Sequence, residues 1–415
     1  MLIKFPRGVR LEQKKDSKWS EQIQAFPTAD VIVLPLPGMK SAGDCRIKEG
    51  GHVSKYSCLF KSNTGACVYS SVSGVLTQIK SVTHPLLGEA LCAVIETDKK
   101  EKEWSKKPFS KSETDSVALI AAAQAAGITD ELDGVPLSQK LEAFRRDQID
   151  VLVVNALDED PYTANASAVL QQSAADILTG LSAAGSASGA KEQKVAVCHL
   201  RQIQKIAEFK KKHSLFIKAG EVYPAWPNVK NKLKSKGKTA GQIGVQACAA
   251  LGCALQTGEP QTSVTVTVAG NGVNNPNVFQ VAIGTPIHHL LDACEMKEST
   301  QYVIMGSPFT GKAVEYLDAP VVASTRCILA LESRKKHKNF PCIGCGTCTK
   351  VCPVGIMPWY IHERIHCQKI DSTQLLRVEN CIHCNACTIA CPSGIGLAEA
   401  VEQAAAIKEE GSDLH

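Results

Sequence analysis

The sequence has no apolar run long enough to span a lipid bilayer. Its most apolar stretch, Val117 to Ile128, is far shorter than the ~20 residues that a transmembrane helix needs. The N-terminal residues, MLIKFPRGVRLEQKK, are charged and lack the apolar segment of a secretory signal peptide. We therefore expect a cytoplasmic protein, soluble or peripherally associated with a membrane, without a transmembrane segment.

A strong charge imbalance and the common catalytic motifs are also missing. The net charge of +5 over 415 residues is too small to indicate nucleic-acid binding. The segment GSPFTGK at 306–312 superficially resembles a phosphate-binding loop, but Ala313 stands where that motif requires Ser or Thr. There is no Ser-His-Asp order and no zinc-hydrolase motif. The sequence therefore identifies no catalytic residues.

Cysteine, by contrast, is abundant, and eight of the 18 cysteines form two copies of one pattern. The copies are CIGCGTCTKVCP at 342–353 and CIHCNACTIACP at 381–392. This C-x2-C-x2-C-x3-C-P spacing is the one by which bacterial ferredoxins hold [4Fe–4S] clusters. Pro353 and Pro392 favour a turn just after each last cysteine. The pattern predicts a pair of clusters, whose common purpose is to pass single electrons.

Each cluster is expected to take one ligand from the other motif. Three closely spaced cysteines let one loop surround three corners of a cluster, and in two-cluster ferredoxins the fourth cysteine ligates the other cluster. Structural zinc is the alternative, but zinc sites usually separate two ligand pairs by about a dozen residues or more. A disulfide framework is the other alternative, and this doubled spacing disfavours it. We therefore assign one cluster to Cys342, Cys345, Cys348 and Cys391, and the other to Cys381, Cys384, Cys387 and Cys352.

The remaining cysteines lie outside the motifs. Free cysteine often serves as a small buried apolar side chain, and we expect that role for each of them. They are Cys45, Cys58, Cys67, Cys92, Cys198, Cys248, Cys253, Cys294, Cys327 and Cys367.

The chain is too long for one hydrophobic core, and its patterns divide it at 1–110, 111–257, 258–331 and 332–415. Short apolar runs between turn residues at 31–97 predict an all-β domain. Helices expected at 116–126, 166–184 and 200–212 alternate with strands at 150–155 and 194–198, which predicts an α/β domain with a parallel sheet. Strands at 263–270, 277–283 and 301–305 and a helix at 286–294 predict an α+β module. Charged linkers are expected at 98–107 and 332–339, and a helix at 397–410.

Three stretches outside the cysteine motifs resemble the RnfC family, which contributes to the Rnf ferredoxin:NAD oxidoreductase complex. They are 47–76, 264–294 and 303–331, and with the motifs the resemblance covers nearly the whole chain. It implies a multidomain α/β and α+β fold with an N-terminal barrel-sandwich hybrid, a Rossmann-like α/β domain, a β-grasp (SLBB-like) module and a C-terminal helical two-cluster ferredoxin-like domain. Residues 47–76 contain no Met-Lys or Lys-Met pair, so no lipoyl or biotin group is expected on the barrel-sandwich.

The resemblance also implies a flavin site in the α/β domain. The segment NALDEDPY at 155–162 resembles the family's N-x-x-[DE]-x-[DE]-P-Y element. By this resemblance Asn155, Asp158 and Asp160 would face the ring and ribityl chain of a flavin such as FMN. The alternative is a polar loop after a strand, in which these side chains serve turns and caps.

The glycine-rich loop that lies against flavin and nicotinamide in relatives of this domain is altered here. The corresponding stretch is AGITDELDGVPLSQKL at 126–141, in which Gly134 and Pro136 remain. Asp130, Glu131 and Asp133 add negative charge where a phosphate would bind. This departure opposes bound flavin and direct NADH oxidation. It also points to soluble relatives of the family, such as the electron-transfer protein associated with D-proline reductase.

Two functions follow from these features. The first is an electron-transfer protein that relays single electrons through two [4Fe–4S] clusters. Its partners would be a ferredoxin- or flavodoxin-like donor and a terminal reductase or Rnf-type membrane complex. Basic runs at 210–213, 230–238 and 334–338 could steer an acidic donor, although each alone is more typical of a solvated face. The second is a flavin-containing NADH dehydrogenase subunit of an Rnf-type complex, because clusters alone cannot accept a hydride.

Overall fold

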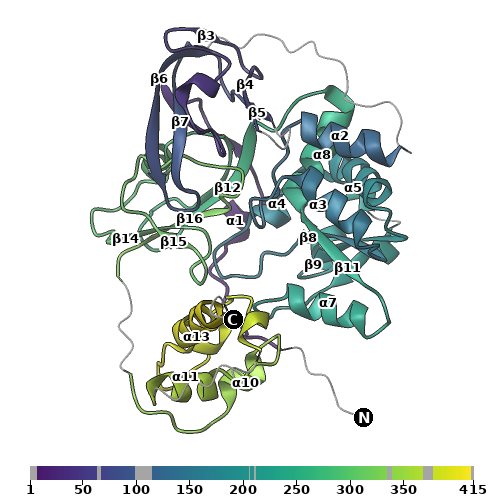
Figure 1. The fold of residues 1–415 in the computed structure, drawn as a ribbon, viewed down its shortest axis with the longest axis vertical. Helices are drawn as coiled ribbons and strands as arrows, with labels where there is room; N and C mark the ends of the chain where they lie inside the picture. The colour runs from purple at the N-terminus through teal and green to yellow at the C-terminus, as the bar shows by residue number, and fades with distance from the viewer. Residues whose placement is uncertain are drawn as a thin grey trace.

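A computed structural model describes residues 7–62, 67–98, 115–204, 206–209, 212–333, 339–367 and 377–412. Figure 1 shows a β domain at the top, an α/β domain beside it, a second sheet between them, and a small helical domain at the bottom. The predicted linker at 98–107 lies outside the described residues except for Asp98, and the basic run at 334–338 lies wholly outside them.

The N-terminal β domain forms where the sequence alternates apolar and polar residues. One sheet has the order β2-β7-β6-β3, and β4 pairs with β5 in a separate hairpin. The side chains of Ile32, Leu76 and Ile95 are fully buried between these layers. The predicted all-β domain is therefore present, with strands β2 (Val31–Pro35), β3 (His52–Val53), β4 (Cys58–Lys61), β5 (Cys67–Tyr69), β6 (Gly74–His84) and β7 (Gly88–Thr97).

The α/β domain contains a parallel sheet of order β10-β9-β8-β11. Its central strand β8 is buried along its whole length, as expected for a strand covered by helices on both faces. The strands are β8 (Val151–Ala156), β9 (Glu192–Val197), β10 (Phe216–Lys218) and β11 (Ala240–Gly244). The helices are α2 (Ser116–Ala125), α3 (Leu137–Arg146), α4 (Asn165–Gln172), α5 (Ala174–Ser188), α6 (Arg201–Gln204), α7 (Trp226–Lys234) and α8 (Val245–Thr257).

Helices α5 and α8 cross unusually closely. A Cβ atom on Gly180 would lie 1.9 Å from the Cys248 carbonyl oxygen, and one on Gly252 would lie 2.0 Å from the Asp176 carbonyl oxygen. Only glycine permits this backbone approach. The crossing holds α8, and therefore its N-terminus, in a defined place against the sheet.

Two helix predictions in this domain differ from the structure. The helix expected at 166–184 is interrupted at Ser173, which separates α4 from α5. The helix expected at 200–212 is replaced by the short α6 and by 3-10 turns at Ala207–Phe209 and His213–Leu215. Phe209 is fully buried against Phe216, with ring centroids 5.1 Å apart, so tertiary packing rather than helix periodicity determines this segment.

The second sheet contains the predicted α+β module. Its order is β1-β13-β12-β16-β14-β15, and β1 (Gln24–Ala25) reaches it from the N-terminal segment, which also contains α1 (Ser17–Ser20). The strands predicted at 263–270, 277–283 and 301–305 and the helix at 286–294 are confirmed. The remaining elements are β12 (Ser263–Ala269), β13 (Asn277–Ala282), α9 (Ile287–Ala293), β14 (Tyr302–Met305), β15 (Lys312–Ala313) and β16 (Cys327–Leu331).

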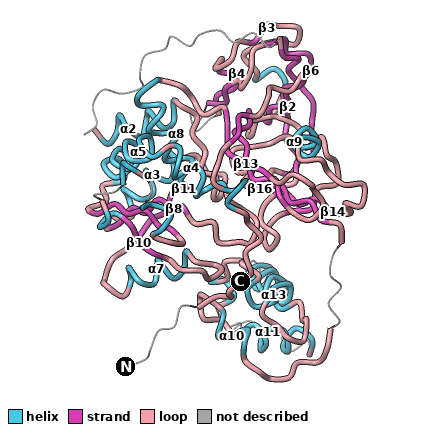
Figure 2. Tube along the Cα trace, turned by 180° about the vertical axis from the view of Figure 1, so that it is seen from behind, coloured by secondary structure: helices cyan, strands magenta, loops and turns pink. Residues whose placement is uncertain are grey.

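The C-terminal domain is helical and small, as Figure 2 shows from behind. Its helices are α10 (Thr347–Val351), α11 (Pro358–His366), α12 (Ala386–Ile389) and α13 (Leu397–Ser412), with a 3-10 turn at Val378–Asn380. α13 packs on α11 through Ile361 and Val401, which are 1% exposed. The described core is small, and much of the domain's interior is lined by cysteine.

Candidate functional site

The two cysteine motifs fold alike. Each begins as a loop and turns into a short helix, α10 in the first motif and α12 in the second. The residue before each helix, Gly346 or Asn385, has a positive φ of 69° or 60°, which glycine and asparagine adopt most readily. This turn brings the third cysteine of each motif onto the first helical turn, facing the same cavity as the loop.

The structure brings the predicted ligands together in the crossed arrangement. One cavity, next to Trp359, is lined by the three loop cysteines of the first motif and the last cysteine of the second. We call these four the outer set: Cys342, Cys345, Cys348 and Cys391. Another cavity is lined by the loop cysteines of the second motif and the last cysteine of the first. We call these four the inner set: Cys352, Cys381, Cys384 and Cys387.

The donor chemistry of both sets fits an iron–sulfur cluster. Among the described residues, no group of three or more His, Cys, Asp or Glu is arranged to hold one metal ion. The thiols of each set instead surround a cavity, as the corners of a cuboidal cluster require. That these particular cysteines are the ligands remains a prediction.

The surroundings of the thiols differ between the sets. Burial raises the pKa of Cys384 to about 11 and that of Cys387 to about 12. These inner thiols are therefore protonated at neutral pH until iron displaces the proton. The backbone N–H of His383 points at Cys381 Sγ, 3.4 Å away. In the outer set, hydrogen bonds from Thr347 lower the pKa of the exposed Cys345.

The inner set lies against the body of the protein. Arg7 Nη1 donates to the carbonyl oxygen of Cys352 at 3.1 Å, and the Asn385 amide donates to the carbonyl oxygen of Phe309. The Phe309 ring lies 4.8 Å from that of Tyr223, which belongs to the α/β domain. Sequence analysis did not identify Tyr223 or Phe309, because neither belongs to a motif. The outer set faces away, and Cys342 and Cys345 are exposed.

The predicted flavin residues lie together at the end of β8, but each is engaged within the chain. Asn155 donates to Gln242 Oε1 at 3.0 Å and accepts from Leu157 N–H at 3.0 Å. Asp158 accepts from the backbone N–H groups of Ala166 and Ser167 at the start of α4.

The other two predicted flavin residues shape turns. Asp160 accepts from the backbone N–H groups of Tyr162 and Thr163, both at 2.8 Å. Gly134 turns its loop with a φ of +75°. Together with the contacts of Asn155 and Asp158, these are the turn and cap roles that the sequence left open as the alternative. Flavin contact by these residues remains untested.

The acidic loop that replaces the glycine-rich loop is buried at the N-terminus of α8. Asp130 is 0% exposed and Glu131 is 3% exposed. Burial, followed by repulsion from Asp130, raises the pKa of Glu131 to about 7. Sequence analysis recognised the negative charge but missed its cation, Lys140, which lies 2.6 Å from Asp130 Oδ2. The sequence signal was available, because Lys140 follows within the first turn of the next helix.

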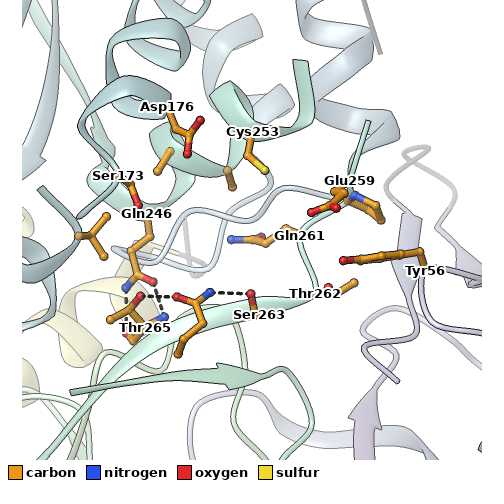
Figure 3. Close-up of a pocket in the computed structure, with 15 residues that line it drawn as sticks. Tyr56, Ser173, Asp176, Gln246, Cys253, Glu259, Gln261, Thr262, Ser263 and Thr265 are labelled. Carbon is orange, nitrogen blue, oxygen red and sulfur yellow. Dashed lines mark hydrogen bonds between the residues drawn. The ribbon is translucent and has the colours of Figure 1, made fainter. Parts of the chain in front are cut away.

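Figure 3 shows a separate polar pocket of about 220 Å³ between α8, the α4–α5 junction and β12. Its floor is closed by internal hydrogen bonds. Gln246 Oε1 accepts from Thr265 N–H at 2.6 Å, and Gln246 Nε2 donates to the Thr265 carbonyl oxygen at 3.0 Å. None of the predicted site residues lines this pocket. It ties the α/β domain to the second sheet.

Of the cysteines outside the motifs, most fit the expected structural role. Six are buried: Cys45, Cys92, Cys198, Cys248, Cys294 and Cys327. Cys58, Cys67 and Cys253 are partly buried, and Cys367 is exposed, so the expectation is wrong for Cys367. No helix among the described residues has the length and apolar character needed to cross a membrane.

Four family models match successive parts of the chain. They are described as the RnfC barrel sandwich hybrid domain (residues 3–100), the Nuo51 FMN-binding domain (123–233), the SLBB domain (265–294) and the 4Fe-4S dicluster domain (341–395). These matches confirm the fold class predicted from the sequence. They support iron–sulfur clusters at the C-terminal end and are compatible with FMN in the α/β domain.

The curated relatives share one description, that of the RnfC component of an "Ion-translocating oxidoreductase complex". The protein of Rhodobacter capsulatus is 25% identical over 391 residues, which cover 88% of this chain and 75% of the relative. The protein of Yersinia pestis bv. Antiqua is 26% identical over 396 residues, covering 86% of this chain and 62% of the relative. For Pseudomonas aeruginosa the identity is 26%, and the chain spans 50% of the relative.

Among solved structures, an air-oxidized NAD+-reducing [NiFe]-hydrogenase is similar with a TM-score of 0.49 and 13% sequence identity. The similarity covers 71% of this chain and 62% of that one.

Proposed function

We propose that this RnfC-like iron–sulfur protein relays single electrons through two [4Fe–4S] clusters, between a reduced carrier and a partner reductase or membrane complex. The observation that carries the proposal is the crossed pair of cysteine sets, which line two neighbouring cavities of one small domain. When bound, each cluster supplies a one-electron store whose potential depends on its hydrogen bonds and exposure. The curated relatives, as members of an ion-translocating oxidoreductase complex, support a membrane complex as one partner.

In this proposal the outer and inner sets are the ligands of the two clusters. The chain's own residues do three things for them. They provide four thiols at each cavity, they direct the His383 N–H toward Cys381 Sγ, and they bury the inner set against Arg7 and Phe309. The division at residues 110, 257 and 331 is part of the same proposal, because it separates this domain from those that hold it.

The two sets have different access to a partner. Exposed Phe340 and Ile343 lie beside the exposed cysteines of the outer set. A partner's redox centre can approach a cluster there without the body of the protein intervening. The inner set, covered by the Tyr223–Phe309 contact, is then the one that communicates with the α/β domain.

A flavin-containing NADH dehydrogenase subunit is the second candidate. The match of residues 123–233 to the Nuo51 FMN-binding domain favours it. It requires a flavin, because a hydride must be divided into single electrons before clusters can take them. The two candidates therefore differ in whether the α/β domain binds FMN.

Iron analysis of double variants tests the crossed ligand sets. The reconstituted protein should hold about eight iron atoms per chain. In Cys342→Ser/Cys391→Ser both losses fall in the outer set, so about half of the iron should remain. In the matched Cys342→Ser/Cys381→Ser variant each set loses one thiol, and little iron should remain. The reverse ranking would show that each motif builds its own cluster.

An anaerobic NADH titration on the same samples separates the two functions. We expect dithionite to bleach the visible absorbance and NADH to leave it unchanged, with no flavin released by heat. Rapid bleaching by NADH together with stoichiometric flavin would establish the second candidate instead.

A further inference from the structure

The N-terminus of α8 is where this α/β fold would be expected to bind a phosphate. α8 begins directly after β11, at the carboxyl edge of the parallel sheet, where open α/β sheets bind their ligands. The helix has 13 residues, and the residue before it, Gly244, has no side chain to cap it. Free backbone N–H groups and the helix dipole at such an end attract an anion.

Two carboxylates of the chain itself already occupy that end. Both oxygens of Asp130 accept from the Gly244 N–H, at 3.1 and 3.0 Å. Glu131 Oε1 accepts from the Gln246 N–H at 2.8 Å, and its Oε2 accepts from the Ala247 N–H at 3.0 Å. The first-turn donors that a phosphate would use are therefore engaged.

The carboxylates also fill the space. A Cβ atom built on Gly244 would lie 2.1 Å from Cδ of Glu131, so the carboxylate rests directly on the backbone. The loop that carries it is closed on itself. Asp130 N–H donates to the Val135 carbonyl oxygen at 2.9 Å, and Thr129 forms a β-bridge with Pro136. A phosphate could enter only if this loop withdrew.

The cation that could attract a phosphate is engaged as well. Lys140 Nζ lies 2.6 Å from Asp130 Oδ2 and 2.9 Å from Asp133 Oδ2. Lys140 and Asp130 are both buried, so the pair is shielded from solvent and from salt. Asp130, Glu131 and Lys140 thus form a closed charge network at the place of the anion.

We propose that the acidic loop at 129–136 is a built-in occupant of the flavin phosphate site, so that the α/β domain does not bind FMN. This inference deepens the relay function proposed above and rests on it for the presence of the clusters. Without a flavin the chain cannot take electrons from a hydride donor. Its electrons then come one at a time from a carrier protein.

Titration of the full, reconstituted chain with FMN under anaerobic conditions is the first test. We expect flavin fluorescence to rise in proportion to added FMN. Saturable, stoichiometric quenching would overturn the inference. Iron and sulfide are measured on the same sample. Missing clusters would contradict the relay function and leave the FMN result valid, so the two failures are distinguishable.

A pair of double variants tests the cause. Asp130→Gly/Glu131→Gly empties the site, frees the α8 N–H groups and leaves Lys140 for the phosphate. It should bind FMN at least about tenfold more tightly than the wild type. Asp130→Asn/Glu131→Gln keeps the site filled and should show no gain. A glycine variant with wild-type circular dichroism and no gain would overturn the inference. If that variant does not fold, the wild-type titration decides.

Discussion

The C-terminal domain and the α/β domain have kept different things. In the C-terminal domain every predicted ligand is present and lies at one of two cavities. The α/β domain keeps the strands and helices of its fold, but Asp130 and Glu131 occupy the helix end where a phosphate would bind. Cluster binding depends on cysteine side chains, whereas phosphate binding depends on glycines and free backbone N–H groups. A fold can therefore persist after such a backbone site has been filled.

Removing one thiol of the inner set should give the largest effect. Cys384→Ser is expected to eliminate one cluster, so that about half of the iron and of the dithionite-bleachable absorbance is lost. The α/β domain should keep its circular dichroism, because its core does not depend on the cluster. Cys367→Ser, an exposed cysteine outside the motifs, is the control and should retain all the iron. Equal iron loss in both variants would refute the assignment.

Breaking the charge network of the α/β domain should give the next largest effect. Lys140→Met leaves Asp130 buried without its cation, which typically costs about 3–5 kcal/mol. The change should appear as a lower midpoint of chemical unfolding for this domain. Arg146→Met removes an exposed ion pair with Asp147 and should change stability by less than about 1 kcal/mol. A similar small effect for Lys140→Met would mean that the network is dispensable.

A pH dependence should sharpen the contrast further. Burial raises the pKa of Glu159 to about 7, against the Ala225 N–H and Arg326, which favour its charged form. Because the folded state then holds a proton that the unfolded state has released, stability should fall as pH rises from about 4.5 to about 7. The expected loss is on the order of 2 kcal/mol.

Glu159→Gln cannot titrate and should flatten this part of the profile. Thermal unfolding midpoints of wild type and variant between pH 5 and 8 measure the difference. Parallel profiles would show that Glu159 is ionised throughout. Glu131, whose pKa is also raised to about 7, should leave a residual slope of the same sign in the variant.

The smallest effect is expected at the joint between the two regions. Asn385→Gly keeps the positive φ that residue 385 needs and removes only the amide bond to the Phe309 carbonyl oxygen. We expect a loss of about 1 kcal/mol, seen as faster proteolytic release of the C-terminal domain, with the iron content unchanged. Loss of iron in this variant would instead mean that the contact shapes the inner cavity.

How far the sequence sufficed depended on the kind of signal. The strands at 263–269 and 277–282 and the central strand at 151–156 follow from local apolar patterns, and the prediction was close. The segment at 200–212 was predicted wrongly, because the burial of Phe209 overrides its helical pattern. The flavin residues were placed together correctly, but their internal hydrogen bonds could not be deduced from the residues alone.

By itself the sequence determined the cluster chemistry, because ligand identity and spacing lie within two short segments and need only a local loop to meet. Only the tertiary structure decided that the inner set faces the body and the outer set faces solvent. Only the tertiary structure placed Asp130 and Glu131 on the N-terminus of α8, which lies more than a hundred residues later in the chain. Burial and hydrogen bonding across that distance depend on the packing of the whole domain, and no local pattern encodes them.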